Sequence, residues 1–148
     1  MFQYAYHLLE ENEDLATDDQ MGSVYLRMGE VEYGLGNYND SIEILKTVLK
    51  NLTYNGITEQ AYRLIGDVYI ETGKFKEILK LYEKWAKEAM KFYDGPNYVS
   101  AYARRTMGDV YLKLEKYKKA FREFENALSL YVELGAEDEA EEIRKIIY

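Results

Sequence analysis

The chain has 148 residues, with 19 basic and 27 acidic side chains and a formal net charge of −8 at pH 7, which argues against a nucleic-acid partner because such binders carry a basic footprint. It contains no cysteine and one histidine, so disulfides, thiol nucleophiles, cysteine-ligated zinc and sites with two imidazoles are excluded. No apolar run approaches the ~20 residues of a membrane span and no signal peptide opens the sequence, so we expect a cytoplasmic protein without a membrane partner.

Apolar residues recur at steps of three and four along the chain, which is the period of amphipathic helices. Thr17 and Gln20 form a capping box at the start of one helix, and Pro96 marks the start of another because proline is favoured in a first helical turn. The pattern predicts eight helices, at residues 2–12, 19–35, 38–51, 58–72, 75–93, 97–114, 117–134 and 136–147.

The chain repeats itself. Three segments align without gaps: Tyr25–Leu49, Tyr62–Ala86 and Arg104–Leu128. Each contains a glycine at the same position, here called the anchor glycine, and these glycines are 37 and 42 residues apart: Gly29, Gly66 and Gly108. A large apolar residue follows sixteen positions later in each copy: Leu45, Tyr82 and Phe124. A period of this length indicates a stacked array of helical hairpins.

The turn inside each hairpin carries a second signal. Gly36 and Gly73 suit the left-handed conformation that ends one helix before the next begins. Glu115 occupies this position in the third copy, so we expect its turn to be less relaxed or differently shaped. Each anchor glycine lies in the middle of a helix, where it costs roughly 1 kcal/mol relative to alanine. Its recurrence predicts that a neighbouring helix approaches too closely for a side chain.

These residues resemble the tetratricopeptide repeat, in the longer form found in kinesin light chains and bacterial sensor-regulators. The second copy carries most of the family signature: Tyr62, Ile65, Gly66, Tyr69, Gly73, Phe75, Tyr82 and Trp85. The copies depart from it at Glu32, Ile78 and Arg104. The resemblance implies an all-α fold: an α-solenoid of antiparallel helix hairpins, with about three tetratricopeptide units and flanking half-units in a right-handed superhelix.

We expect one tetratricopeptide domain over residues 1–148. Its predicted parts are an N-terminal helix or half-unit, three full units and a C-terminal capping helix, at residues 1–17, 19–51, 58–93, 97–134 and 136–148. A helix with a polar outer face is what the end of a repeat array needs.

The resemblance also implies a concave binding face lined by the first helix of each unit. The residues it places there are Leu26, Glu30, Tyr33, Arg63, Asp67, Ile70, Tyr102, Arg105, Asp109 and Leu112. A mixed surface of this kind suits an extended peptide or a helix. Two interpretations of the arginines remain open: ordinary ion pairs with Asp67 and Asp109 four residues later, or contacts with a carboxylate of the partner.

Charge is unevenly distributed, because residues 1–60 hold 3 basic and 11 acidic side chains. A basic cluster lies in the third unit: Lys113, Lys116, Lys118, Lys119 and Arg122. It is either a solvated face or a docking patch for an acidic partner or a neighbouring copy.

No residue pattern indicates a catalytic, cofactor or metal site. We therefore predict a non-enzymatic scaffold that binds a protein or peptide segment on its concave face. The alternative is a structural or sensory domain of a larger regulatory protein that forms homo-oligomers, such as a homodimer.

Overall fold

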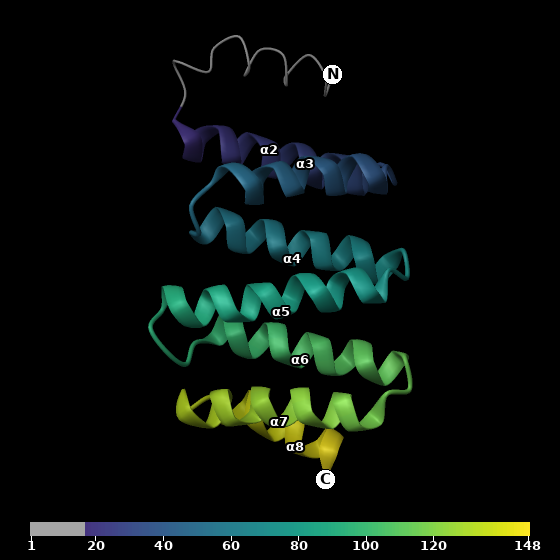
Figure 1. Ribbon diagram of the computed structural model, residues 1–148, viewed down its shortest axis with the longest axis vertical. Helices are drawn as coiled ribbons and strands as arrows, with labels where there is room; N and C mark the ends of the chain where they lie inside the picture. Colours follow the sequence, from purple (N-terminus) through teal and green to yellow (C-terminus); the bar gives the residue numbers. More distant parts are fainter. Residues whose placement is uncertain (1–16) are drawn as a thin grey trace. The chain divides into compact units, whose positions relative to one another are not determined.

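A computed structural model describes residues 17–148, in which all regular structure is α-helical (Figure 1). Its helices are α2 (Asp18–Gly34), α3 (Tyr38–Asn51), α4 (Gly56–Glu71), α5 (Phe75–Phe92), α6 (Tyr98–Lys113), α7 (Tyr117–Glu133) and α8 (Glu137–Ile147). The prediction of an all-α fold is confirmed. The helix predicted over 2–12 lies outside the described residues.

The predicted helix boundaries agree with the structure to within a residue or two. The capping box at the start of α2 is present, since Thr17 Oγ1 accepts from Gln20 N at 3.1 Å and Gln20 Oε1 accepts from Thr17 N at 3.0 Å. α4 begins at Gly56 rather than at residue 58 because Asn55 caps it, accepting a hydrogen bond from Ile57 N at 2.9 Å. An asparagine side chain at this position satisfies an amide that has no partner inside the helix.

The chain divides into two compact units that meet in sequence at Gly73 and Lys74. In the N-terminal unit, α2, α3 and α4 pack against one another. In the C-terminal unit, α5 packs on α6, α6 on α7 and α7 on α8. The boundary falls inside the predicted unit 58–93, at the turn between its two helices.

The turns inside the hairpins share one conformation. The backbone is left-handed at Gly36 (φ 80°) and Gly73 (φ 70°), as predicted. Glu115 (φ 57°) adopts the same conformation, so the alternative of a differently shaped turn is wrong. The other alternative, a less relaxed turn, agrees with a left-handed backbone at a residue that has a side chain. The amide of Glu115 donates to Leu112 O at 3.0 Å, as the amide of Gly36 donates to Tyr33 O at 3.0 Å. Hydrogen bonds of the closing turn thus hold a non-glycine residue where glycine is favoured.

Two anchor glycines lie where a neighbouring helix approaches closely. A Cβ atom on Gly29 would lie 2.6 Å from Leu45 Cδ2, and one on Gly108 would lie 2.8 Å from Phe124 Cε1. Both partners are the residues sixteen positions after the glycine. The predicted close approach is therefore confirmed for the first and third copies.

α8 closes the core of the C-terminal unit. Ala140 and Ile143 of α8 are fully buried, in one cluster with Phe124 and Ala127 of α7. The opposite face is charged, and acidic residues in its first turn lie at the positive end of the helix dipole: Glu137, Asp138 and Glu139. α8 thus has one buried and one charged face, and its role as a capping helix stays a prediction.

Candidate protein-binding surfaces

Leu26 is not a surface residue. It is 2 % exposed, because α2 packs against both α3 and α4 and its buried face is correspondingly wide. The prediction that Leu26 contacts a partner is therefore corrected: it belongs to the core of the N-terminal unit.

Glu30 and Tyr33 are engaged within the N-terminal unit. Exposed Glu30 accepts from Arg27 Nη1 at 2.9 Å. The hydroxyl of Tyr33 donates to the Glu71 carboxylate, which also accepts from the Tyr38 hydroxyl at 3.0 Å. The hydrogen bond to Glu71 raises the pKa of Tyr33 to about 12, and the two tyrosines lower the pKa of Glu71. Tyr33 thus ties α2 to α4.

Three predicted residues share one face of α4. Arg63 and Asp67 are exposed and Ile70 is partly exposed. Partial burial raises the pKa of Asp67, an effect that the charge of Arg63 opposes. The aspartate is therefore held in a partly desolvated place beside a cation.

The same arrangement recurs on α6. Asp109 and Leu112 are exposed, the latter by 38 %, and Arg105 is half-buried. Arg105 Nη1 donates to Glu142 Oε2 of α8 at 2.6 Å, a partner that neither sequence interpretation anticipated. Burial raises the pKa of Asp109, whereas Arg105 and Lys113 act to lower it. The face thus offers a cation, a partly desolvated anion and an apolar side chain.

Tyr102 is the first of the predicted binding residues on α6. Its ring lies 5.9 Å from Trp85 and 6.5 Å from Tyr82, centroid to centroid, in edge-on and tilted arrangements. Both partner rings are buried. Tyr102 is partly exposed, so it links the aromatic core of the C-terminal unit to the surface.

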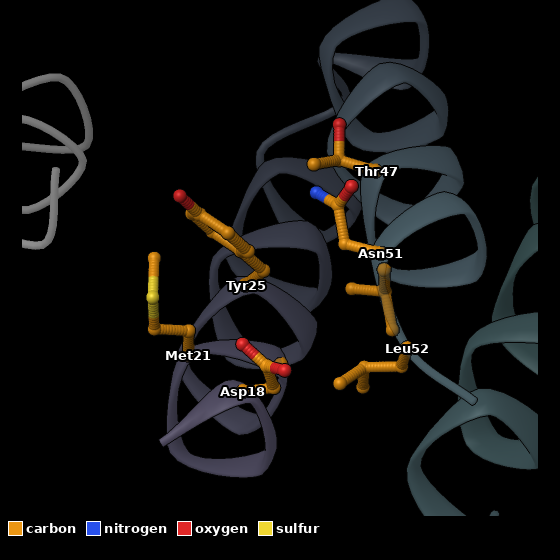
Figure 2. A pocket seen from close by; sticks show the side chains of 8 residues that line it. Asp18, Met21, Tyr25, Thr47, Asn51 and Leu52 are labelled. Atoms are coloured by element: carbon orange, nitrogen blue, oxygen red, sulfur yellow. The ribbon is translucent and has the colours of Figure 1, made fainter. Parts of the chain in front are cut away.

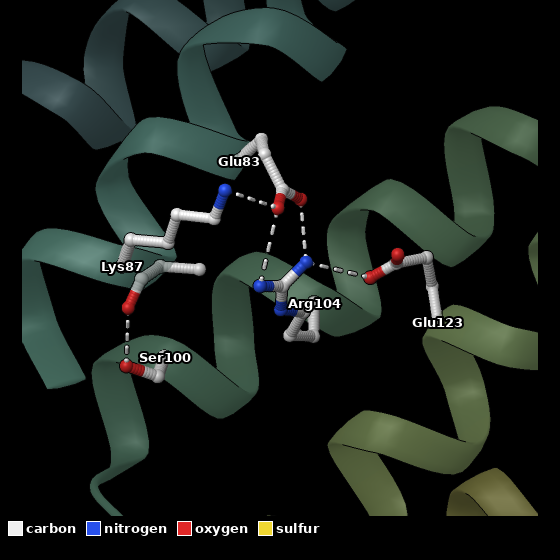
Figure 3. A network of polar contacts seen from close by, with 6 residues as sticks. Glu83, Lys87, Ser100, Arg104 and Glu123 are labelled. Carbon is white, nitrogen blue, oxygen red and sulfur yellow. Dashed lines mark hydrogen bonds and ion pairs between the residues drawn. The ribbon is translucent and has the colours of Figure 1, made fainter. Parts of the chain in front are cut away.

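Behind this face, Arg104 joins three helices (Figure 3). Its Nη1 atom lies 2.5 Å from Glu83 Oε2 of α5 and 3.3 Å from Glu123 Oε2 of α7. Lys87 Nζ lies 3.4 Å from Glu83 Oε1. Burial acts to lower the pKa of Arg104, but the hydrogen bond to Glu83 and the charge of Glu123 outweigh it, so this pKa is raised.

This network explains why Arg104 departs from the repeat pattern. The first two copies have Tyr25 and Tyr62 at the position of Arg104. They have Ile44 and Leu81 at the position of Glu123. The third copy therefore has two oppositely charged residues at the positions where the other copies have an aromatic and an aliphatic residue. The sequence contained this signal, but only a comparison of both positions together reveals it.

A cavity of about 260 Å³ opens in the N-terminal unit between the start of α2 and the end of α3 (Figure 2). Its lining residues are Asp18, Met21, Gly22, Tyr25, Thr47, Val48, Asn51 and Leu52. Sequence reasoning did not identify this cavity. It is smaller than the roughly 300–1,000 Å³ of pockets that enclose drug-sized ligands.

Part of the predicted basic cluster packs on aromatic rings. Lys113 Nζ lies 5.8 Å from the centre of the Phe75 ring, and Lys119 Nζ lies 5.9 Å from that of Tyr111. These distances are within reach of a cation–π interaction. For these two lysines the structure therefore provides a role in packing.

Within residues 17–148, no helix is long and apolar enough to cross a bilayer. Within the same range, histidine and carboxylate side chains form no group of three or more that could hold a metal ion.

The described residues define the class of protein: it is built from repeated helical hairpins, and its exposed side chains lie along the surfaces of the helices. The family model described as tetratricopeptide repeat matches residues 20–85 and 57–133. The chain therefore belongs to the tetratricopeptide repeat family. Proteins of this fold are protein–protein interaction scaffolds and are typically non-catalytic.

Similarity to solved structures supports the same fold. The chain is similar to the protein in the crystal structure of MamA, with 21% sequence identity and a TM-score of 0.58. The match covers 97% of this chain and 82% of that chain. A comparison with curated proteins found no match.

Proposed function

We propose that this protein is a non-catalytic scaffold that binds a peptide or helix of a partner protein on the face formed by the first helices of its repeats. The observation that carries the proposal is the repeated set of an arginine, an aspartate and an aliphatic residue. Arg63, Asp67 and Ile70 on α4 have the same spacing as Arg105, Asp109 and Leu112 on α6. The set recurs in the second and third copies at positions that are exposed or only partly buried.

The side chains have complementary roles in binding. An aliphatic or aromatic side chain of the partner would pack on Leu112 or Ile70, where burial of apolar surface supplies affinity. A carboxylate of the partner would take the place of Glu142 at Arg105, because Glu142 is 61 % exposed and can return to water. Charged groups around such a site select partners and set their register.

Selection from a random-peptide library on the purified chain tests the proposal, with affinities measured by fluorescence anisotropy. Arg105→Ala should weaken binding of selected peptides about tenfold, equal to 1.4 kcal/mol. Leu112→Asp should weaken it further. Lys84→Ala, which removes an exposed cation on α5 outside both candidate surfaces, is the control and should change little. Peptides that bind all variants equally would refute the proposal.

A second candidate function is homo-oligomerisation. It is supported by Val31 and Leu35 of α2, which are 58 % and 68 % exposed. Burial of such side chains between two copies would favour association. Light scattering over a range of concentrations decides, since a concentration-independent monomer rules this function out.

A further inference from the structure

The basic cluster of the third repeat lacks acidic partners. Its five members are Lys113, Lys116, Lys118, Lys119 and Arg122. All five are exposed, and among residues 17–148 none of them forms an ion pair with a carboxylate. Other cations of the same compact unit do form such pairs: Lys84, Lys87, Arg104, Arg105 and Arg144. The cluster is therefore an uncompensated positive region in a chain whose net charge is −8.

Contacts with aromatic rings position two of these cations. Lys113 Nζ lies 5.8 Å from the centre of the Phe75 ring, at the start of α5. Lys119 Nζ, on α7, lies 5.9 Å from the centre of the Tyr111 ring of α6. A ring contact holds an ammonium group in place without neutralising its charge. Two further exposed lysines flank Phe75 in the sequence: Lys74 and Lys76. The cluster thus extends over adjoining ends of α5, α6 and α7, which pack in this order.

The start of α7 adds to the positive potential. Lys118 and Lys119 lie in the first turn of α7, which contains no acidic residue. The helix dipole favours negative charge at this end of a helix. Five other described helices, α2, α3, α4, α5 and α8, have at least one acidic residue in the first turn. The side chains of α7 therefore strengthen the attraction for anions instead of offsetting it.

Exposed aromatic rings lie beside the cations. Tyr117 and Phe121 are 63 % and 39 % exposed, and they are four residues apart on α7. Lys118 and Arg122 each follow one of these rings with the same spacing. Residues four apart lie one above the other on a helix. α7 thus presents a row of rings next to a row of cations.

We propose that this cluster binds an acidic segment of a partner protein in which carboxylates alternate with aromatic or aliphatic residues. The carboxylates pair with Lys118 and Arg122, and the apolar side chains pack on Tyr117 and Phe121. The site is distinct from the face around Arg105 that we propose for the first helices of the repeats, and it does not depend on that proposal.

The charge distribution favours a polypeptide segment over other polyanions. Charges act over about 8 Å at physiological ionic strength, so a short segment responds to the cluster and not to the net charge. A nucleic-acid duplex or an anionic bilayer is larger, and it also approaches the acidic residues that α8 exposes in the same unit. Repulsion from those carboxylates opposes its binding.

Fluorescence anisotropy on the full chain tests the proposal. The probe is a fluorescein-labelled peptide in which pairs of glutamates alternate with phenylalanine, compared with the same peptide carrying glutamine for glutamate. The acidic peptide should bind about tenfold more tightly, and added salt should weaken it. Lys118→Gln with Arg122→Gln should weaken binding about tenfold, as expected for the loss of two exposed ion pairs. The matched control, Lys91→Gln with Lys145→Gln, removes two exposed lysines outside the cluster and should change little.

Four results would overturn the proposal: equal binding of the two peptides, equal effects of the cluster variant and the control, binding lost in Arg105→Ala but kept in the cluster variant, or tighter binding of single-stranded DNA or anionic phospholipid vesicles than of the acidic peptide. The third result would place the peptide on the face around Arg105. Circular dichroism checks that the variants are folded. Light scattering should find the same mass for the wild type and the cluster variant, and self-association lost only in the variant would assign the cluster to a second copy instead.

Discussion

The Arg104–Glu123 ion pair can be tested as the reason why the third repeat has an arginine where the others have a tyrosine. We consider Arg104→Tyr and Glu123→Leu, which restore the residue types of the second copy, Tyr62 and Leu81, to the third. Each single substitution breaks the ion pair, whereas the double substitution replaces both charges with an apolar pair. The network therefore predicts opposite outcomes for the single and double variants.

The magnitudes follow from burial. Arg104→Tyr leaves the Glu123 carboxylate, 11 % exposed, without its cation. Removing one partner of a fully buried pair costs about 3–5 kcal/mol, and the residual exposure reduces this to about 2–3 kcal/mol. Glu123→Leu leaves Arg104 paired with Glu83 at 2.5 Å, so we expect a loss of about 1 kcal/mol.

The double variant should lie within about 1 kcal/mol of the wild type, because an apolar pair often replaces a buried ion pair without loss. Glu83 then loses Arg104 but is 42 % exposed and keeps Lys87. The expected coupling energy is therefore about 2–3 kcal/mol.

Urea unfolding measures these differences, with the emission of Trp85 as the probe. Trp85 is the single tryptophan, it is 1 % exposed, and it lies on α5 in the same unit as the ion pair. Unchanged dependence of the unfolding free energy on urea shows that the variants unfold alike. If the double variant is destabilised by the sum of the single losses, the explanation of Arg104 by Glu123 is wrong.

Three further predictions concern backbone and pH. Glu115→Gly should stabilise the C-terminal unit by about 0.5–1 kcal/mol in urea unfolding, since it relieves a left-handed glutamate. Gly108→Ala should destabilise the protein by about 1–2 kcal/mol, because the added Cβ would lie 2.8 Å from the Phe124 ring. Gly34→Ala should stabilise it by about 0.5 kcal/mol, because no atom lies within 4 Å of the added Cβ. Thermal unfolding measures both variants, and equal effects would contradict the packing argument. The hydrogen bond to Glu71 raises the pKa of Tyr33 from the ordinary 10.0 to about 12. Its stabilisation of the N-terminal unit is therefore complete below pH 10 and is lost as pH rises through 12. An NMR titration should find a lower Tyr33 pKa in Glu71→Gln, and an unchanged value would refute the bond.

Features encoded by neighbouring residues could be predicted from the sequence. Thr17 and Gln20 are three positions apart and form a cap by themselves. The recurrence of the anchor glycine predicted that a neighbouring helix approaches Gly108 closely, and the structure identifies Phe124, sixteen residues later, as the residue in contact. Local turn geometry and the internal repeat thus predicted the helices and their pairing.

Features that depend on three helices could not be predicted. Tyr33 and Glu71 are 38 residues apart, and no spacing rule pairs them. The burial of Leu26 follows from α2 packing on two helices at once, whereas the repeat pattern assigned it a position on the binding face. The partner of Arg105 is Glu142 of α8, whose acidic residues resemble a solvated face when α8 is considered alone.

Comparing equivalent positions of the repeats distinguishes residues that pack in the core from residues that remain at the surface. Val68 and Val110 occupy the same position in two repeats and are both buried in the core. Arg104 differs from its counterparts and is explained by a changed core. Arg63 and Arg105 occupy the same position in the second and third copies, neither is fully buried, and each lies beside a partly desolvated aspartate. Arg105 already pairs with Glu142 within the chain, and the proposed peptide selection tests whether a partner carboxylate binds at these arginines.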